Sequence, residues 1–151
     1  MENTGSFHLE AHVKRVPPRL NLASLPTPVE PLAVPGGRDV WIKRDDRSSD
    51  RYGGGKVRKL EFILAQAEVS EARRIRSIGA FGSHHLLALA IHGEVIGLGV
   101  DAIVAPQVVT KAAVRNLAAL TSLGARFIPV MDRLCVPWGM WKGHRDGGAV
   151  F

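Results

Sequence analysis

The chain has 151 residues, of which 46% are hydrophobic and 23% charged, enough for one ordinary domain with a buried core. Its net charge of +6 invites a nucleic-acid partner, but the basic residues are scattered among Asp and Glu without interleaved aromatic residues, so nucleic-acid binding is not expected. The N-terminus has no signal-peptide pattern, and no apolar run approaches the roughly 18 residues that span a bilayer. The single cysteine, Cys135, suits a reducing compartment. We therefore expect a cytoplasmic protein without a membrane partner.

The first third of the chain is expected to be extended. Residues 1–38 are rich in proline and contain no convincing helix, so they should run over the surface of something larger. Asp39–Lys43 reads as a strand, followed by a polar loop that ends in glycines. We therefore take residues 1–50 as an extended leader and strand of a larger domain, and residues 51–151 as a small α/β domain.

A helix is expected from near Lys56 to about Val69, because apolar residues recur there at helical spacing. These residues are Leu60, Ile63, Leu64 and Ala67. Three glycines, Gly53–Gly55, come directly before the helix and allow positive φ and close backbone approach.

Three cations, Lys56, Arg58 and Lys59, fall in the first turn of this helix. The positive end of the helix macrodipole lies there, so each cation should destabilise the helix by roughly 0.3 kcal/mol or more. Exposed N–H groups together with clustered cations indicate an anion-binding site. The alternative is a solvated basic helix start that follows a flexible loop.

The rest of the chain alternates between strands and helices. The expected elements are strands at 75–79, 100–105 and 125–130 and helices at 83–96 and 110–124. In the second of these helices Thr110 is the expected N-cap, Gly124 the expected stop, and Val114, Leu117 and Ala118 the expected core face. This alternation predicts an α/β fold with βαβ units and a parallel sheet.

A second candidate site lies where the strand at 75–79 gives way to a helix at Ser83, because α/β sheets bind ligands at the carboxyl ends of their strands. The Ser83 hydroxyl and N–H suit a carboxylate or phosphate, although Ser83 could serve only as an N-cap. His84 is a candidate hydrogen-bond partner in a pocket. A metal site is not expected, because adjacent helical residues such as His84 and His85 point about 100° apart.

Two other kinds of binding site, a nucleotide-binding P-loop and a cation site, are not expected. The run from Gly54 to Lys56 ends like a nucleotide-binding P-loop, but that motif would need glycine in place of Asp50 and Ser or Thr in place of Val57. The neighbours Asp45 and Asp46 lie beside basic residues, so ion pairs are expected there rather than a cation site.

Four ordered motifs resemble the D-cysteine desulfhydrase and 1-aminocyclopropane-1-carboxylate (ACC) deaminase family, a group of pyridoxal-phosphate enzymes of the tryptophan synthase β type. The motifs are Leu25–Leu32, Trp41–Asp46, Gly53–Phe62 and Ile78–His85. Their order and spacing make the resemblance more specific than any one of them. It covers about residues 20–151 and corresponds to the N-terminal half of a partial tryptophan synthase β-like fold, with the C-terminal half missing.

The resemblance implies a role for four residues. Lys56 matches the lysine that forms a Schiff base with pyridoxal 5'-phosphate, and Lys59 matches a lysine that helps hold its phosphate. Ser83 matches a serine that meets the substrate carboxylate, and His84 stands near the cofactor ring hydroxyl. Both Gly55 and His84 replace an asparagine of the common pattern.

The function implied is that of a pyridoxal-phosphate-dependent lyase or deaminase. Its substrate would be a small amino acid such as D-cysteine or 1-aminocyclopropane-1-carboxylate, and the full-length protein would be a homo-oligomer. The alternative is a non-catalytic truncated fragment that folds partially or pairs with a partner chain.

Overall fold

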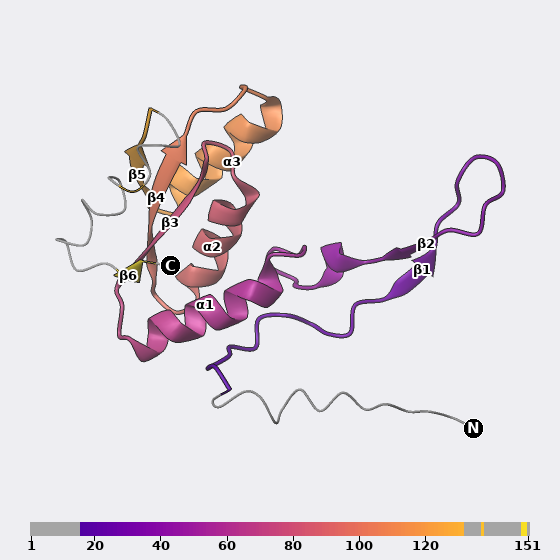
Figure 1. Ribbon diagram of the computed structural model, residues 1–151, viewed down its shortest axis with the longest axis horizontal. Coiled ribbons are helices and arrows are strands. Elements are labelled where there is room, and N and C mark those ends of the chain that lie inside the picture. Colours follow the sequence, from indigo (N-terminus) through magenta and orange to yellow (C-terminus); the bar gives the residue numbers. More distant parts are fainter. Residues whose placement is uncertain (1–15, 132–136, 138–148, 151) are drawn as a thin grey trace.

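The computed structural model describes residues 16–131, 137 and 149–150. Figure 1 shows an α/β unit from which a long arm projects. The unit contains a four-stranded parallel sheet in the order β5-β4-β3-β6. Its strands are β3 (Arg74–Ala80), β4 (Gly99–Ala105), β5 (Arg126–Pro129) and β6 (Ala149–Val150). The predicted α/β class with a parallel sheet is confirmed, while β6 was not foreseen.

The helices whose bounds the described residues give are α1 (Val57–Val69), α2 (His84–Glu94) and α3 (Lys111–Ser122). Helix α2 packs on β3 and β4 and also contacts α1 and α3 (Figure 1). The chain steps from β3 to β4 to β5 in one direction, so right-handed crossovers place α2 and α3 on the same face of the sheet. Within the described ranges, no helix is long and apolar enough to cross a membrane.

The termini of α3 agree with the sequence prediction. The Thr110 hydroxyl accepts a hydrogen bond from the Ala113 N–H at 3.1 Å, and Gly124, just past the helix, has a φ of +70°. The predicted core face is wrong, however. Val114 and Ala118 are exposed and Leu117 is half-buried, whereas Ala113 and Leu120 are the buried residues of the helix. The buried face of α3 thus differs from the predicted one, because only a narrow stripe of the helix contacts α2.

The core lies between the sheet and the helices. It is formed by apolar side chains of α1, α2, β3 and β4, which include Leu60, Leu64, Ile75, Leu86, Leu89, Val100, Ala102 and Val104. Residues of a strand alternate between the two faces of a sheet, so Arg76 and Asp101 lie on the face opposite these side chains. Both are buried, and Asp101 accepts from the Arg76 guanidinium at 3.3 Å.

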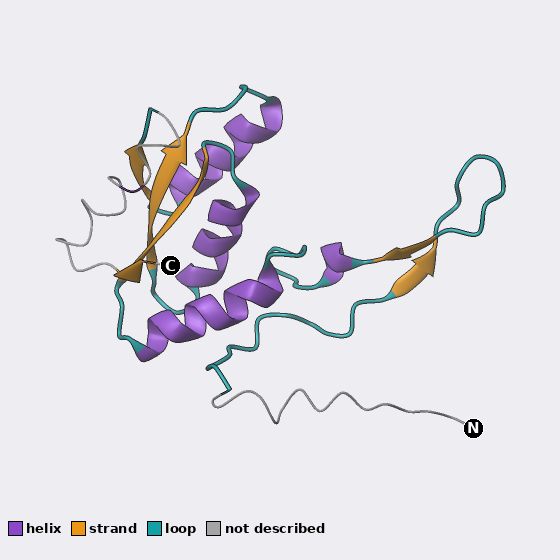
Figure 2. Ribbon diagram, in the orientation of Figure 1, coloured by secondary structure: helices purple, strands orange, loops and turns teal. Residues whose placement is uncertain are grey.

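The arm is a two-stranded antiparallel ribbon that Figure 2 shows extending away from the α/β unit. Its strands are β1 (Val29–Pro31) and β2 (Trp41–Lys43), and Glu30 pairs with Ile42. The strand predicted at Asp39–Lys43 is confirmed in its last three residues, and its partner β1 was not predicted. Trp41 is 59% exposed and Val29 58% exposed, so the ribbon buries little apolar surface within the described part of the chain.

The leader is fixed to the first helix by one buried carboxylate. Glu61 of α1 is 1% exposed and accepts hydrogen bonds from the backbone N–H groups of Leu22 (3.1 Å) and Ala23 (2.9 Å). It also accepts from the Arg19 guanidinium at 2.8 Å. The leader is therefore attached to the small α/β unit itself, and the expected domain boundary near residue 50 stays a prediction.

Candidate functional site

The glycine loop before α1 is a fixed turn. The Gly54 N–H donates to the Asp45 carbonyl at 2.7 Å and to the Ser48 hydroxyl at 3.0 Å, and Gly54 has a φ of +109°. A side chain at Gly53 would collide with the backbone carbonyl of Asp46, whereas a Cβ at Gly55 would meet nothing within 4 Å. This turn holds the exposed Lys56 at the N-cap of α1.

One of the three clustered cations is neutralised locally. The Arg58 guanidinium donates to both carboxylate oxygens of Asp45, at 2.8 and 2.9 Å. These hydrogen bonds lower the pKa of Asp45 to about 2. The expected ion pairing of Asp45 is thus confirmed. Among the described residues, Lys56 and Lys59 form no ion pair, so two positive charges remain at this end of α1.

Lys59 lines a cavity of about 350 Å³ between α1, α2 and β3. The other lining residues are Ile63, Ile75, Ser77, Ile78, His85 and Leu89. Ser77 and His85 are its further polar groups, and their Oγ and Nε2 atoms lie 3.1 Å apart. The His85 Nδ1 atom is buried and has no hydrogen-bond partner in the part of the chain that the structure describes. The cavity therefore offers a polar atom that a bound group could satisfy.

The charges around this cavity are coupled. Burial and the positive charges of Lys59 and Lys56 lower the pKa of His85 to about 4, so its imidazole is neutral near pH 7. Burial and the charge of Lys56 also lower the pKa of Lys59. The two predicted lysines are thus close enough to His85 to act on it, and an anion here would relieve their mutual repulsion.

The sequence prediction considered His85 only as a rejected metal ligand and did not consider Ser77. The spacing of residues in the sequence nevertheless pointed to both of them. Lys59 and Ile63, like His85 and Leu89, are four residues apart on one helical face, and Ile75 and Ser77 share one face of a strand. Which of these faces meet depends on how the helices pack on the sheet.

Ser83 caps helix α2, which was the simpler of the two roles that the sequence suggested for it. Its hydroxyl oxygen accepts from the Leu86 N–H at 3.4 Å, a long and hence weak cap. A Cβ at Gly79 would come within 2.6 Å of the Ser83 side chain, so glycine is required for this approach. The role of Ser83 toward a substrate stays a prediction.

His84 has a partner that the sequence did not reveal. Its Nδ1 atom lies 2.6 Å from the hydroxyl of Tyr52, and the two rings are 28° from parallel with centroids 6.5 Å apart. Tyr52 directly precedes the glycine loop. The loop that carries Lys56 is therefore linked to the N-terminal end of α2.

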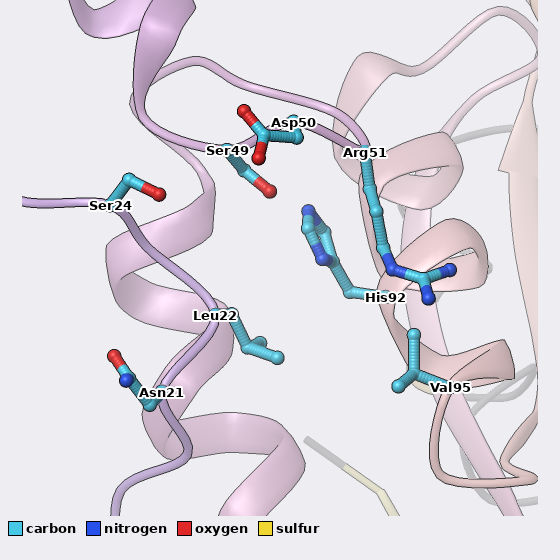
Figure 3. Close-up of a pocket in the computed structure, with 8 residues that line it drawn as sticks. All are labelled: Asn21, Leu22, Ser24, Ser49, Asp50, Arg51, His92 and Val95. Atoms are coloured by element: carbon cyan, nitrogen blue, oxygen red, sulfur yellow. The ribbon is translucent and has the colours of Figure 1, made fainter.

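A second cavity, of about 250 Å³, lies where the leader meets α2 (Figure 3). In Figure 3 the leader residues Asn21, Leu22 and Ser24 lie across the cavity from His92 and Val95 of the α2 region. None of the predicted site residues lines it, so the candidate site is the one around Lys59. In the described ranges, no group of three or more His, Cys, Asp or Glu side chains is arranged to hold a metal ion.

The chain is similar in sequence to several named enzymes. It is 39% identical over 119 residues to nocardicin C-9' epimerase of Nocardia uniformis, a match that covers 79% of this chain and 36% of that protein. It is 38% identical over 92 residues to the bifunctional D-cysteine desulfhydrase/1-aminocyclopropane-1-carboxylate deaminase of Arabidopsis thaliana, which covers 58% of this chain and 23% of the relative. No protein-family model matches the chain.

The fold is shared with a solved structure. The chain superposes on an ACC deaminase homologue with a TM-score of 0.72 and 25% identity, over 89% of this chain and 43% of the other. The matches thus cover less than half the length of these proteins, between 23% and 43%. These matches confirm the resemblance drawn from the four sequence motifs, and the partial coverage is consistent with an N-terminal portion of such a protein.

Proposed function

We propose that this chain, a relative of the D-cysteine desulfhydrases and ACC deaminases in sequence and fold, is part of a pyridoxal-phosphate-dependent enzyme that acts on a small amino acid. The observation that carries the proposal is the pairing of Lys56 and Lys59 at the start of α1 with the polar cavity that Lys59 and His85 line. Lys56 is the residue we assign to attachment of the cofactor and Lys59 the residue we assign to its phosphate.

The residues present fit such a cofactor. It carries a phosphate and a polar aromatic ring, and the site supplies two cations without ion-pair partners among the described residues together with the N-terminal end of a helix. The buried Nδ1 atom of His85 lacks a partner in the described part of the chain, and a polar ring atom could provide one. No atom lies within 4 Å of the position that a Cβ would take at Gly55, so the turn leaves open space beside Lys56.

When bound, pyridoxal phosphate would supply an electron sink for carbanion chemistry at the substrate α-carbon. The chain's own residues would position the cofactor and the substrate and would exchange protons with them. The Lys56 amine is placed by the glycine turn and could accept or return a proton at its Nζ atom. The Ser83 hydroxyl stands at the N-terminus of α2, where a carboxylate is favoured by the helix dipole.

The reaction that follows is proposed as lyase or deaminase chemistry, in line with the names of several relatives. One relative, matched over 79% of this chain, is named as an epimerase, so proton exchange at the α-carbon is a second candidate outcome. The two differ in their products. Elimination releases ammonia or sulfide, whereas epimerisation in heavy water exchanges the α-proton and releases neither.

The proposal is tested by incubating the protein with pyridoxal phosphate, reducing it with borohydride and locating the adduct by mass spectrometry. We expect one adduct, on Lys56, and its loss in Lys56→Ala. Lys59→Ala should weaken retention of the cofactor and leave the attachment site unchanged. Lys111→Ala is the matched control, because Lys111 is also exposed in the first turn of a helix. A single reduced adduct that persists in Lys56→Ala would refute the assignment.

The alternative is a non-catalytic fragment that folds partially or pairs with another chain. It predicts no specific adduct at Lys56 but scattered labelling of exposed lysines. The genomic sequence that follows the codon for Phe151 separates the two cheaply, because a continuing frame with a second glycine-rich phosphate loop favours the enzyme.

A further inference from the structure

Tyr52 makes three contacts that tie the glycine loop to helix α2. Its hydroxyl lies 2.6 Å from His84 Nδ1, and its ring stacks on the His84 ring. Its backbone carbonyl accepts a hydrogen bond from Nε2 of His92, a histidine that is 1% exposed. One residue next to Gly53 is thus connected to the first turn of α2 and to a buried residue two turns later.

The direction of the hydrogen bond between the Tyr52 hydroxyl and His84 decides which ring nitrogen of His84 carries a proton. A neutral imidazole has one protonated and one unprotonated ring nitrogen, and the neighbour of one nitrogen fixes the state of the other. Burial raises the pKa of the Tyr52 phenol, so the hydroxyl keeps its proton near pH 7 and is available as a donor. If it donates to Nδ1, the proton of His84 must reside on Nε2.

We propose that Tyr52 is a positioning residue for His84: its hydroxyl donates to Nδ1, so that His84 keeps an Nε2–H donor at the N-terminal end of α2. The same contacts hold the loop that carries Lys56 against α2. The proposal rests on the proposed function only for the identity of the acceptor, which is an oxygen of the bound cofactor or substrate. The tautomer itself is a property of the chain.

The tautomer is read directly by NMR of the protein with ¹⁵N-labelled histidine, about two pH units above the usual histidine pKa. The His84 signals are assigned by their loss in His84→Asn. We expect an unprotonated Nδ1 and a protonated Nε2 in the wild type. Tyr52→Phe keeps the ring and removes the hydroxyl, and it should shift the His84 signals toward a mixture of both tautomers. A proton on Nδ1 in the wild type, or unchanged signals in Tyr52→Phe, would overturn the proposal.

The His92 signals serve as an internal control. His92 contacts the backbone carbonyl of Tyr52, which the Tyr52→Phe change leaves in place. Unchanged His92 signals therefore show that the loop still lies on α2, so that the shift at His84 comes from the hydroxyl alone. Movement of both sets of signals would mean that Tyr52 acts as a general packing residue and would count against the proposal.

A double-mutant cycle tests the consequence for binding. Tyr52→Phe should weaken binding of pyridoxal phosphate or substrate about two- to tenfold, the range of one hydrogen bond. In the His84→Asn background the effect should fall to about twofold or less, because an amide carries its own N–H donors without help from a neighbour. Equal losses in both backgrounds would refute the coupling. Absence of any adduct at Lys56 would instead refute the proposed function and leave the tautomer result standing.

Discussion

The Arg58 guanidinium and the Asp45 carboxylate form a two-pronged ion pair, with N–O distances of 2.8 and 2.9 Å, that joins the first turn of α1 to the short 3₁₀ turn at Asp45–Arg47. The Asp45 backbone carbonyl also accepts from Gly54. One aspartate therefore holds both the middle of the glycine loop and the first turn of the helix that follows it, and it removes Arg58 from the cations that an anion could meet.

This ion pair should make the fold sensitive to acid. Because the pKa of Asp45 is lowered from its usual value of 3.8 to about 2 in the folded chain, the stability it contributes is fully present above about pH 4 and is lost as the pH falls toward 2. Asp45→Asn should lower stability near neutral pH and flatten the dependence of stability on pH between these values. Denaturant titrations followed by circular dichroism at a series of pH values measure this.

Asp50→Asn is the control for this experiment, because Asp50 lies in the same loop but is exposed and in no ion pair within the described ranges. It should leave the acid limb unchanged. If Asp45→Asn and the wild type lose stability in parallel as the pH falls, the ion pair does not hold the loop.

Ser83→Ala separates a helix cap from a substrate contact. Loss of a hydrogen bond to a charged substrate group is worth roughly 1.5–3 kcal/mol and should raise the apparent binding constant by about one to two powers of ten. Cofactor binding should change little. Thr110→Ala removes the equivalent cap from α3 and is the matched control for stability. If the two variants lose similar stability and Ser83→Ala binds every tested amino acid as the wild type does, the hydroxyl is only a cap.

Two glycines of the loop, Gly54 and Gly55, should differ sharply in the substitutions that they tolerate. Gly54 has a φ of +109°, so Gly54→Ala should destabilise the loop by about 1 kcal/mol or more. Gly55 has no positive φ and open space at its Cβ position, so Gly55→Ala should be close to neutral. Thermal unfolding of the two variants provides the measurement. Equal destabilisation would show that the turn is not held as described.

Gly55→Asn extends this test to function, because asparagine stands at this position in the common family pattern. The open space indicates that the side chain fits without loss of stability. We expect tighter retention of pyridoxal phosphate, measured by dialysis and absorbance, since the amide adds a donor beside Lys56.

The 151-residue chain alone should associate and should not turn over substrate. The β1–β2 ribbon exposes Trp41 and Val29, and no further strand in the described part of the chain pairs with its outer edges, which invite contact with other chains. Light scattering after size exclusion should therefore give a mass above that of one chain, and assays for ammonia and sulfide should match free cofactor. Trp41→Lys should reduce association more than Val69→Lys, which places the same charge at an exposed position on α1. A monomeric chain that catalyses release of ammonia or sulfide would contradict this prediction.

The sequence by itself determined the α/β class and the positions of most elements, because periodicity and capping act over a few residues. The helix after Lys56, the Thr110 cap and the Gly124 stop are local in this sense. The ribbon strand β1 was missed, since a three-residue strand that follows Pro28 and ends at Pro31 carries no periodic signal and pairs only because β2 lies beside it.

The composition of the candidate site was only half visible in the sequence. Lys56, Lys59, Ser83 and His84 stand out because they sit at helix starts, and this is a local feature. The pairing of Arg58 with Asp45, the approach of His85 to Ser77 and the contact of Tyr52 with His84 join residues 8 to 32 positions apart. Such contacts are decided by how α1 packs on α2 and α2 on β3, because packing of apolar faces, rather than any local propensity, sets which polar side chains meet.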